Sequence, residues 1–323
     1  MLRYESVDVK NGSEIKAFIE SNPREFTNKF CFSSPSEKKT IVDQAVKEVM
    51  QNLQNGVGFC ARTDSRLKAL AIMTRSDWGS GFLKRKMGEL ALYVLLSEGE
   101  MNSFLQTIFL KAAEMGFDAI FVRIDMAQMK LIQYILTKGA VLGDILVTFG
   151  MSLSKGKQLE SLTVIGRSDI AFENGTAAHE EQLGKITVNA YKHSHYFNDS
   201  NIPLVHAERV YQEWIRNSLN GYANLVIVAK LKERIVGYIT LRISKLGEKA
   251  YGTIDLIAIE ERHRGHGIGR MLVTEAISRV RAAVDSIYVS TQVSNLAAMR
   301  LYQGLGFEPL LSEATLHFWL KSL

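Results

Sequence analysis

Three glycines stand among basic side chains in the stretch HRGHGIGRML, residues 263–272. The preceding segment TIDLIAI, from Thr253, alternates in polarity and predicts a buried strand, while the apolar spacing after Val273 predicts a packed helix. The start of a helix has unpaired N–H groups and a partial positive charge, and glycine lets an anion come close to the backbone. We therefore expect this turn to bind a pyrophosphate, assisted by the charges of Arg262, Arg264 and Arg270.

Two common phosphate-binding motifs do not match this stretch. A P-loop requires Gly-Lys-Ser/Thr, whereas residues 269–271 read Gly-Arg-Met. A dinucleotide fingerprint, G-x-G-x-x-G, requires a glycine where Arg270 stands, and it opens a domain at its first strand. The phosphate ligand therefore belongs to another class, or the stretch is only a glycine-rich turn into a helix.

A second motif, NLAAMRLYQGLGFEP, starts at Asn295. Asn295 is suited to cap a helix, and Tyr302 lies about two turns later on the same face. Together with the order Arg264-Gly265-His266-Gly267-Ile268-Gly269, this motif resembles the two signatures of the GNAT acetyltransferase superfamily. The alternative for Tyr302 is a packed core residue, but the order of strand, glycine turn, helix, strand and Asn/Tyr helix favours the GNAT interpretation.

The resemblance implies acetyl-CoA as the cosubstrate. The central strand would hold the pantetheine and polarise the thioester carbonyl, and the glycine turn would bind the pyrophosphate. Tyr302 would protonate the departing thiolate after direct attack by the substrate amine, because a phenol keeps its proton at neutral pH. The residues implied in acetyl-CoA binding are Ile257, Ala258, Ile259, Arg264, Gly265, His266, Gly267, Ile268, Gly269, Arg270 and Asn295.

The base that deprotonates the attacking amine stays open. Asp255, Glu260 and Glu261 stand near the end of the predicted strand, and a relay of water molecules is the alternative. His193 and His195 form an H-x-H pair, but no matching cluster of Cys, Asp or His accompanies them in the sequence. We therefore expect no metal site.

The chain contains an internal repeat. FVRIDMAQMKLIQYILTKGAVLGD, from Phe121, aligns without a gap to YVSTQVSNLAAMRLYQGLGFEPLL, from Tyr288, and a strand–turn–strand pattern from Cys60 matches one from Val228. The two offsets are nearly equal, at 167 and 168 residues. We therefore predict an α/β fold of two tandem GNAT-like domains, each a mixed twisted sheet flanked by helices, over residues 1–155 and 160–323, joined near residues 154–157.

The first half lacks the chemistry of the second. A shift of 167 residues places Ile135 under Tyr302, and Ile135 has no proton to give. The same shift puts Glu98 and Glu100 under the glycine turn, where carboxylates would repel a pyrophosphate. We expect residues 1–155 to bind no CoA and instead to support the fold, to wall the substrate site, or to pair two chains in a homodimer.

The acceptor is indicated by a narrower resemblance. KHSHYFNDSNIP, ERVYQEWIRNSLNG, GYITLR and STQVSNLAAMRLY resemble the dTDP-fucosamine acetyltransferases, and FLKRKMGEL echoes their short N-terminal domain. This implies a small-molecule primary amine as acceptor, with a dTDP- or UDP-linked amino sugar as the first expectation. An arginine could meet the diphosphate, and aromatic rings could stack on sugar or base. The candidate residues are Tyr196, Tyr238, Arg242 and Gln292.

Three other functions stay open: a ligase-like acetyltransferase of the mycothiol synthase type, a protein N-terminal acetyltransferase, and a non-catalytic acetyl-CoA sensor. A sensor would have no use for the acid Tyr302. A peptide acceptor would require an open groove, whereas a nucleotide sugar would require an enclosed pocket with a cationic site.

The composition of the chain limits the classes of partner that we expect. The 323 residues are 46% hydrophobic and 23% charged with a net charge of +5, which is typical of a globular protein of two domains. No apolar run is long enough to cross a bilayer, and no basic cluster with aromatic platforms indicates a nucleic acid. With two cysteines, Cys31 and Cys60, we expect a cytoplasmic protein without a membrane or nucleic-acid partner.

Overall fold

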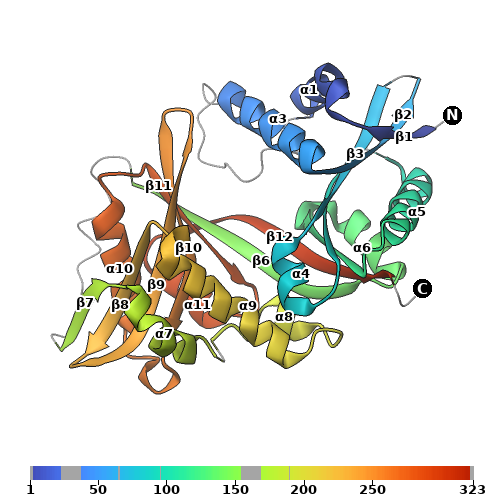
Figure 1. Cartoon of the computed structure of the whole chain (residues 1–323). Coiled ribbons are helices and arrows are strands. Elements are labelled where there is room, and N and C mark those ends of the chain that lie inside the picture. The colour runs from blue at the N-terminus through green and yellow to red at the C-terminus, as the bar shows by residue number, and fades with distance from the viewer. Residues whose placement is uncertain are drawn as a thin grey trace. The chain divides into compact units, whose positions relative to one another are not determined.

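The computed structural model describes residues 3–22, 38–64, 66–94, 96–153, 169–188 and 190–320. These residues belong to two compact units (Figure 1). Unit 1 comprises Met1–Ile145 with Leu311–Leu323, and unit 2 comprises Leu146–Leu310. The join expected at residues 154–157 lies outside the described residues.

Unit 1 has a mixed sheet in the order β1-β2-β3-β4-β5-β12. Only β4 and β5 run parallel, and the other neighbours are antiparallel. Its strands are β1 (Arg3–Val7), β2 (Gly56–Thr63), β3 (Arg66–Arg75), β4 (Met87–Val94), β5 (Ala119–Asp125) and β12 (Glu308–Trp319). Its helices are α1 (Gly12–Ser21), α3 (Lys38–Asn55), α4 (Asp77–Leu83), α5 (Glu98–Glu114) and α6 (Met129–Thr137), with 3-10 turns at Val9–Asn11 and Met126–Gln128.

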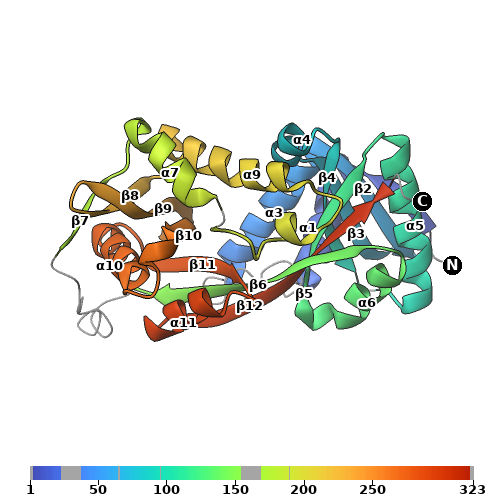
Figure 2. The same ribbon diagram turned by 90° about the horizontal axis from the view of Figure 1, so that it is seen from below.

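Unit 2 repeats this plan in the order β6-β11-β10-β9-β8-β7, with β10 and β11 as the parallel pair. In Figure 2, α7 and α9 lie along one side of β8–β10 and α10 lies along the other. The strands are β6 (Val141–Ser152), β7 (Ile170–Asn174), β8 (Leu225–Leu231), β9 (Arg234–Leu246), β10 (Lys249–Ile259) and β11 (Ser286–Gln292). The helices are α7 (Glu180–Thr187), α8 (His195–Asn198), α9 (Leu204–Asn217), α10 (Ile268–Val280) and α11 (Leu296–Gly304), with 3-10 turns at Ala177–His179 and Glu261–His263 and a π turn at Ser218–Tyr222.

The internal repeat is visible in the element boundaries. The strands β5 and β11 begin at Ala119 and Ser286, 167 residues apart, and the helices that follow them, α6 and α11, begin at Met129 and Leu296, again 167 apart. The final strands β6 and β12 keep the same offset. The predicted fold of two tandem mixed α/β units is confirmed.

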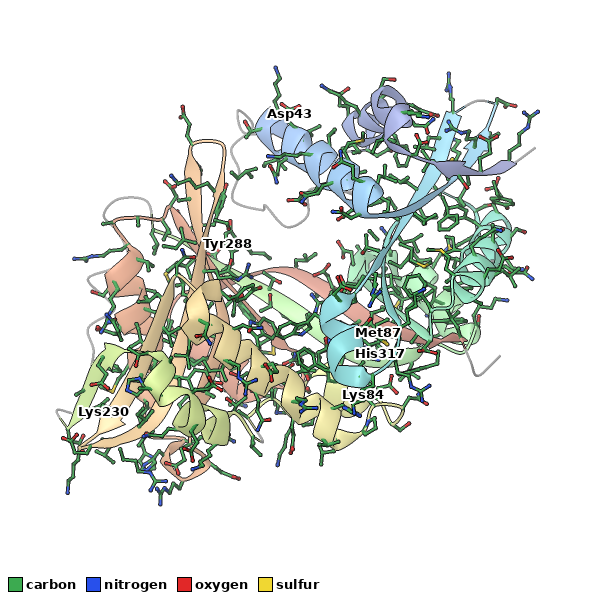
Figure 3. The ribbon with its side chains drawn as sticks, in the orientation of Figure 1. Asp43, Lys84, Met87, Lys230, Tyr288 and His317 are labelled. Carbon is green, nitrogen blue, oxygen red and sulfur yellow. The ribbon has the colours of Figure 1, made fainter. Side chains whose placement is uncertain are left out.

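Each unit takes its last strand from the other half of the sequence. β12, near the end of the chain, pairs with β5, and β6, the last strand of the first half, pairs with β11. Within unit 1, the ring of His317 on β12 (labelled in Figure 3) stacks on Phe121 of β5, with centroids 3.9 Å apart. The compact units therefore differ from the sequence halves 1–155 and 160–323 by this exchange of strands.

The exchange follows the apolar faces of the two strands. Ala314, Leu316 and Phe318 of β12 are buried in the core of unit 1. Val147, Phe149 and Met151 of β6 are buried in the core of unit 2. Alternate residues of a strand lie on one face, so either strand can close either sheet as far as its pattern is concerned. The two strands stand at equivalent places in the repeat, which makes each a structural substitute for the other.

Candidate active site

The glycine turn between β10 and α10 has the geometry of an anion site. Gly265 and Gly267 have φ angles of +78° and +80°, and a Cβ on either would meet nothing within 4 Å. Glycine is therefore required by the backbone angles, and the space beside them is open. Gly267 is the N-cap of α10 and offers no side chain to the N–H groups of the first turn. Those N–H groups and the helix dipole suit a phosphate.

The third glycine has a different role. A Cβ on Gly269 would lie 3.3 Å from Leu301 Cδ2 and 3.4 Å from Ile259 Cδ1. Gly269 thus lets the first turn of α10 pack closely against α11 and the end of β10. Arg270 strengthens this contact, since its guanidinium donates to the carbonyl oxygen of Gly304 over 2.7 Å.

The basic side chains of the turn are held by the protein itself. Arg264 Nε donates to the carbonyl oxygen of Ile259 over 3.0 Å, and His266 Nδ1 lies 2.8 Å from the carbonyl oxygen of Arg264. Ile268 is buried in the core of unit 2. Positive charge is therefore fixed around the turn, while the backbone N–H groups are left to make direct contacts with an anion.

The central strand β10 parts from β11 beside this turn. The ladder between them joins Tyr251–Ile254 to Ser286–Val289 and goes no further, although both strands continue. Ile257, Ala258 and Ile259 stay paired with β9 alone. Their backbone groups on the side away from β9 therefore face the divergence of the two parallel strands, where an extended chain can bind.

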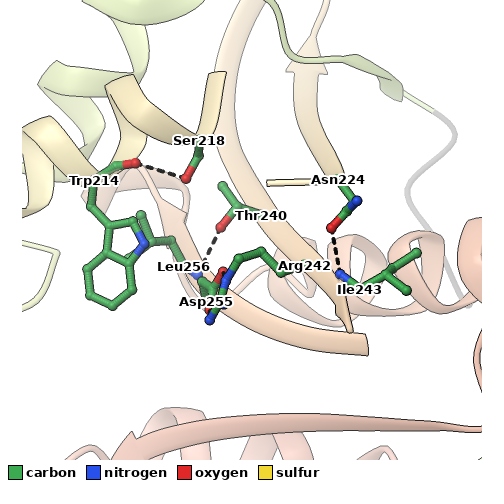
Figure 4. Close-up of polar contacts among 8 residues, drawn as sticks. All are labelled: Trp214, Ser218, Asn224, Thr240, Arg242, Ile243, Asp255 and Leu256. Carbon is green, nitrogen blue, oxygen red and sulfur yellow. Dashed lines mark hydrogen bonds and ion pairs between the residues drawn. The ribbon is translucent and has the colours of Figure 1, made fainter. Parts of the chain in front are cut away.

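A bulge at Asp255 shapes β10 before the divergence (Figure 4). The Leu256 N–H donates to the hydroxyl of Thr240 over 3.1 Å. The Asp255 carboxylate, only 4% exposed, accepts two hydrogen bonds from Arg242, of 2.6 and 2.8 Å. This pairing raises the pKa of Arg242 further and holds its guanidinium over the ring of Tyr222, 4.9 Å from the centroid. The bulge is thus fixed by side chains on the neighbouring strand.

Tyr302 lies on α11 in the core of unit 2. Asn295 caps this helix as expected, and its Oδ1 accepts the N–H of Ala298 over 3.2 Å. The Tyr302 ring is 2% exposed, with centroids 6.0 Å from Phe149 and 5.8 Å from Phe307. Burial raises the pKa of Tyr302, so the phenol keeps its proton across the physiological range.

Residues 189–307 match the family described as Acetyltransferase (GNAT) family. This segment is a GNAT acetyltransferase domain. Over nearly the whole chain, the protein is 24% identical to the spore coat polysaccharide biosynthesis protein SpsD of Bacillus subtilis (strain 168), across 87% of this chain and 96% of the relative. A shorter stretch of 57 residues, 17% of this chain, is 46% identical to N-alpha-acetyltransferase 30 of Saccharomyces cerevisiae and covers 32% of it.

The fold is similar to that of a tandem GNAT protein from the clavulanic acid biosynthesis pathway, with a TM-score of 0.58 at 11% identity. That likeness covers 99% of both chains. The protein therefore contains an N-acetyltransferase domain of the GNAT family, which uses acetyl-CoA, within a fold of two tandem units.

The GNAT domain brings the expected acetyl-CoA residues into one region of unit 2. The glycine turn, the end of β10 and the second half of α11 meet there, because Gly269 lies close to both Ile259 and Leu301. The open space beside Gly265 and Gly267 fits a pyrophosphate. The side chains of Arg270 and Asn295, which are also expected to contact the cosubstrate, bind Gly304 and Ala298 and so help to position α11.

The expected acceptor residues occupy different surroundings in the GNAT domain. Tyr238 is fully buried, and Tyr196 is buried with its ring 6.3 Å from that of Tyr211. Arg242 is half-exposed in its pair with Asp255. Gln292 ends β11 opposite Leu146 of β6.

Two of the three candidate bases are paired with arginines. Asp255 is held by Arg242, and Glu260 is held by Arg234 at 2.6 Å. Glu261 is exposed. His193 Nδ1 lies 3.1 Å from the Ser294 hydroxyl, at the loop before α11. In the described part of the chain, no group of three or more His, Cys, Asp or Glu side chains could hold a metal, and no helix there is long and apolar enough to cross a membrane.

Sequence reasoning missed two residues beside Tyr238. Its hydroxyl lies 2.8 Å from Thr187 Oγ1 and 3.2 Å from Tyr191 Oη. The Tyr191 ring stacks on Tyr211 of α9, with centroids 4.3 Å apart. The sequence carries no spacing signal for this group, because its members are 47 and 51 positions from Tyr238.

Proposed function

We propose that this N-acetyltransferase moves the acetyl group of acetyl-CoA to the amino group of a nucleotide-linked amino sugar. The observation that carries the proposal is the match to SpsD, because it spans 96% of a relative named for polysaccharide biosynthesis. Polysaccharides are built from activated sugars, and an amino sugar supplies the primary amine that a GNAT enzyme acetylates. The resemblance to dTDP-fucosamine acetyltransferases supports the same acceptor class.

The proposed mechanism assigns a role to each part of the site. When bound, acetyl-CoA supplies an activated thioester. The N–H groups of the first turn of α10 bind the pyrophosphate charge, and the backbone of Ile257 and Ile259 orients the pantetheine and polarises the carbonyl. Tyr302 holds its phenolic proton in a dry environment and gives it to the departing sulfur.

The acceptor side has charged and aromatic groups suited to a sugar nucleotide. Arg242 and Tyr222 stack on the sheet face beside the bulge, and Asp255 keeps the guanidinium in place. Asp255 already offsets part of the positive charge that Arg242 would present to a diphosphate. Aromatic stacking and hydrogen bonds to hydroxyl groups therefore contribute more to recognition than net charge does.

The test is thiol release from acetyl-CoA with a panel of dTDP- and UDP-linked amino sugars, run beside polyamines, amino acids and N-terminal peptides. Wild type and Tyr302→Phe are compared, with acetyl-CoA affinity measured by calorimetry in both. We expect turnover with an amino sugar that the variant loses while it still binds acetyl-CoA. Turnover confined to the other amines would contradict the sugar assignment.

A protein N-terminus is the second candidate acceptor. The 46% identity to N-alpha-acetyltransferase 30 over 57 residues favours it, although this match covers a small part of both chains. The peptide arm of the same panel distinguishes the two. If acetyl-CoA binds and no amine reacts, the protein is a sensor and both catalytic proposals fail.

A further inference from the structure

A series of hydrogen-bonded hydroxyl groups lies in unit 2, and the donor at each of its contacts can be assigned. Thr187, the last residue of α7, donates its hydroxyl proton to the carbonyl oxygen of Leu183 over 2.7 Å. A hydroxyl has one proton, so Thr187 must accept at its 2.8 Å contact with Tyr238. The proton of Tyr238 is thereby committed to Thr187. At the 3.2 Å contact between the two phenols, Tyr191 must then be the donor.

This order of donors and acceptors fixes the role of the Tyr191 hydroxyl in its hydrogen bonds. Its proton is used inward, toward Tyr238, and its oxygen keeps lone pairs that can accept a hydrogen bond. The ring cannot turn freely, because it is stacked on Tyr211 with an angle of 9° between the planes. Tyr191 therefore presents a fixed acceptor atom at the end of a polar chain that starts at a helix carbonyl.

Tyr191 ends this chain beside the proposed reaction centre. Tyr238 stands opposite Ala258 in the pairing of β9 with β10, between the two residues whose backbone would hold the thioester. Burial raises the pKa of Tyr191 well above its ordinary value, and the neighbouring phenol of Tyr238 raises it further, so Tyr191 keeps its proton. Tyr191 is half-buried, whereas Tyr238 is fully buried, so Tyr191 is the member of the chain that a ligand can reach.

We propose that Tyr191 binds the acceptor, with its oxygen taking a hydrogen bond from an N–H of the attacking amine so that the nitrogen lone pair is aimed at the acetyl carbon. Thr187 and Tyr238 are positioning residues, because they set the polarity of Tyr191 without touching the amine. The inference rests on the proposed acetyl transfer in unit 2. It does not depend on which primary amine is the substrate.

The experiment compares Tyr191→Phe with wild type on the amine of the panel that gives the highest kcat/KM. The variant keeps the stack on Tyr211 and loses only the oxygen. We expect kcat/KM for the amine to fall about tenfold to a hundredfold, the range for one lost hydrogen bond at a half-buried site. The affinity for acetyl-CoA should not change. Equal kcat/KM in the two proteins would overturn the proposal.

Two further substitutions separate polarity from packing. Thr187→Val removes the hydroxyl that orders the chain, and we expect a smaller fall in kcat/KM for the amine than in Tyr191→Phe. Thr187→Ser restores the hydroxyl and should restore kcat/KM. A purely structural role of Thr187 would change the melting temperature without changing kcat/KM per folded enzyme, and that result would overturn the polarity argument.

A tyrosine of unit 1 serves as the matched control. Tyr134 on α6 also donates its hydroxyl, to Asn102, so Tyr134→Phe loses a hydrogen bond that belongs to unit 1. If no amine of the panel reacts, the proposed function fails, and the Tyr191 and Tyr134 variants are compared on the slow hydrolysis of acetyl-CoA. There water would donate to Tyr191 in place of the amine, and an unchanged hydrolysis rate in Tyr191→Phe would contradict the inference by itself.

Discussion

The first turns of α5 and α10 stand at equivalent places in the repeat and are completed in opposite ways. In α5, Glu100 accepts hydrogen bonds from the N–H and the hydroxyl of Ser97, of 3.0 and 2.6 Å. The residue 167 positions after Glu100 is Gly267, the N-cap of α10, which has a left-handed backbone and no side chain. The first turn of α5 thus contains its own carboxylate, whereas the start of α10 leaves space for the anionic group of a ligand. This difference supports the proposal that only unit 2 binds acetyl-CoA.

The helices α6 and α11 differ in the same sense. Ile135 of α6 and Tyr302 of α11 are both buried and occupy equivalent positions, but only the phenol can move a proton. Ile135 can therefore fill the packing role of this position but not the acid role that we propose for Tyr302. The first half of the chain still takes part in unit 2, because its last strand brings Phe149 against Tyr302.

We expect the largest loss of stability and activity when one of the exchanged strands is removed. A fragment of residues 160–323 would lack β6, the partner of β11, and would lose the buried side chains of Val147, Phe149 and Met151. Each is worth about 1.5–3 kcal/mol, so the loss is comparable with the whole stability of a domain. We expect the fragment to be unfolded and inactive by circular dichroism and thiol release.

Co-expression with residues 1–155 is the control for this fragment, because it supplies β6 and accepts β12. Recovery of folded, active protein is expected. A fragment 160–323 that folds and turns over alone would show that the exchanged strands are not needed by the unit they complete.

Replacing Tyr302 removes the phenol that distinguishes α11 from α6. Tyr302→Phe keeps the contacts with Phe149 and Phe307, and Tyr302→Ile copies the residue found in α6. We expect kcat to fall about 10²–10⁴-fold in both, the range for loss of a general acid. Saturating kinetics with the reactive amine would measure it. A Phe variant with wild-type kcat would remove the acid role and leave Tyr302 as a core residue.

Local patterns in the sequence predicted the tandem fold, the glycine turn and the cap at Asn295, since each depends on residues near one another in the chain. The exchange of β6 and β12 was not predicted, because two strands with equivalent apolar faces do not specify which sheet each one joins. The contact of Arg270 with the carbonyl oxygen of Gly304, on a helix 34 positions away, was not predicted. Contacts of this kind depend on tertiary packing and leave no spacing in the sequence.

The donor and acceptor role of the Tyr191 hydroxyl could not be predicted from the sequence for the same reason. It depends on a threonine at the end of one helix and a tyrosine on a strand, and each is an ordinary residue in its own segment. Only their distances show that one proton is committed after another along the chain.

A charge at Gly267 would make the start of α10 resemble that of α5. Gly267→Asp and Gly267→Asn have nearly the same shape, and both residues tolerate the left-handed region better than most. They differ by one negative charge beside the proposed pyrophosphate. We expect Asp to weaken acetyl-CoA binding at least about tenfold more than Asn, equal to about 1.4 kcal/mol, with a smaller gap at high salt. Calorimetry at two salt concentrations measures both effects, and equal affinities would place the pyrophosphate elsewhere.

The smallest effect is expected from Glu100→Gln at the start of α5. The Ser97 hydroxyl, and then its N–H, lowers the pKa of Glu100, so folding favours the carboxylate. A lowered pKa means that the stabilisation is present above the ordinary value of about 4.3 and is lost as the pH falls through the folded pKa. The melting temperature of the variant should therefore be slightly below that of wild type at pH 7, and the gap should close in acid. Because this carboxylate is fully exposed, the change should be small, and acetyl-CoA affinity should stay the same. A change in that affinity would mean that the start of α5 also binds the cosubstrate, and the contrast between the two helix starts would fail.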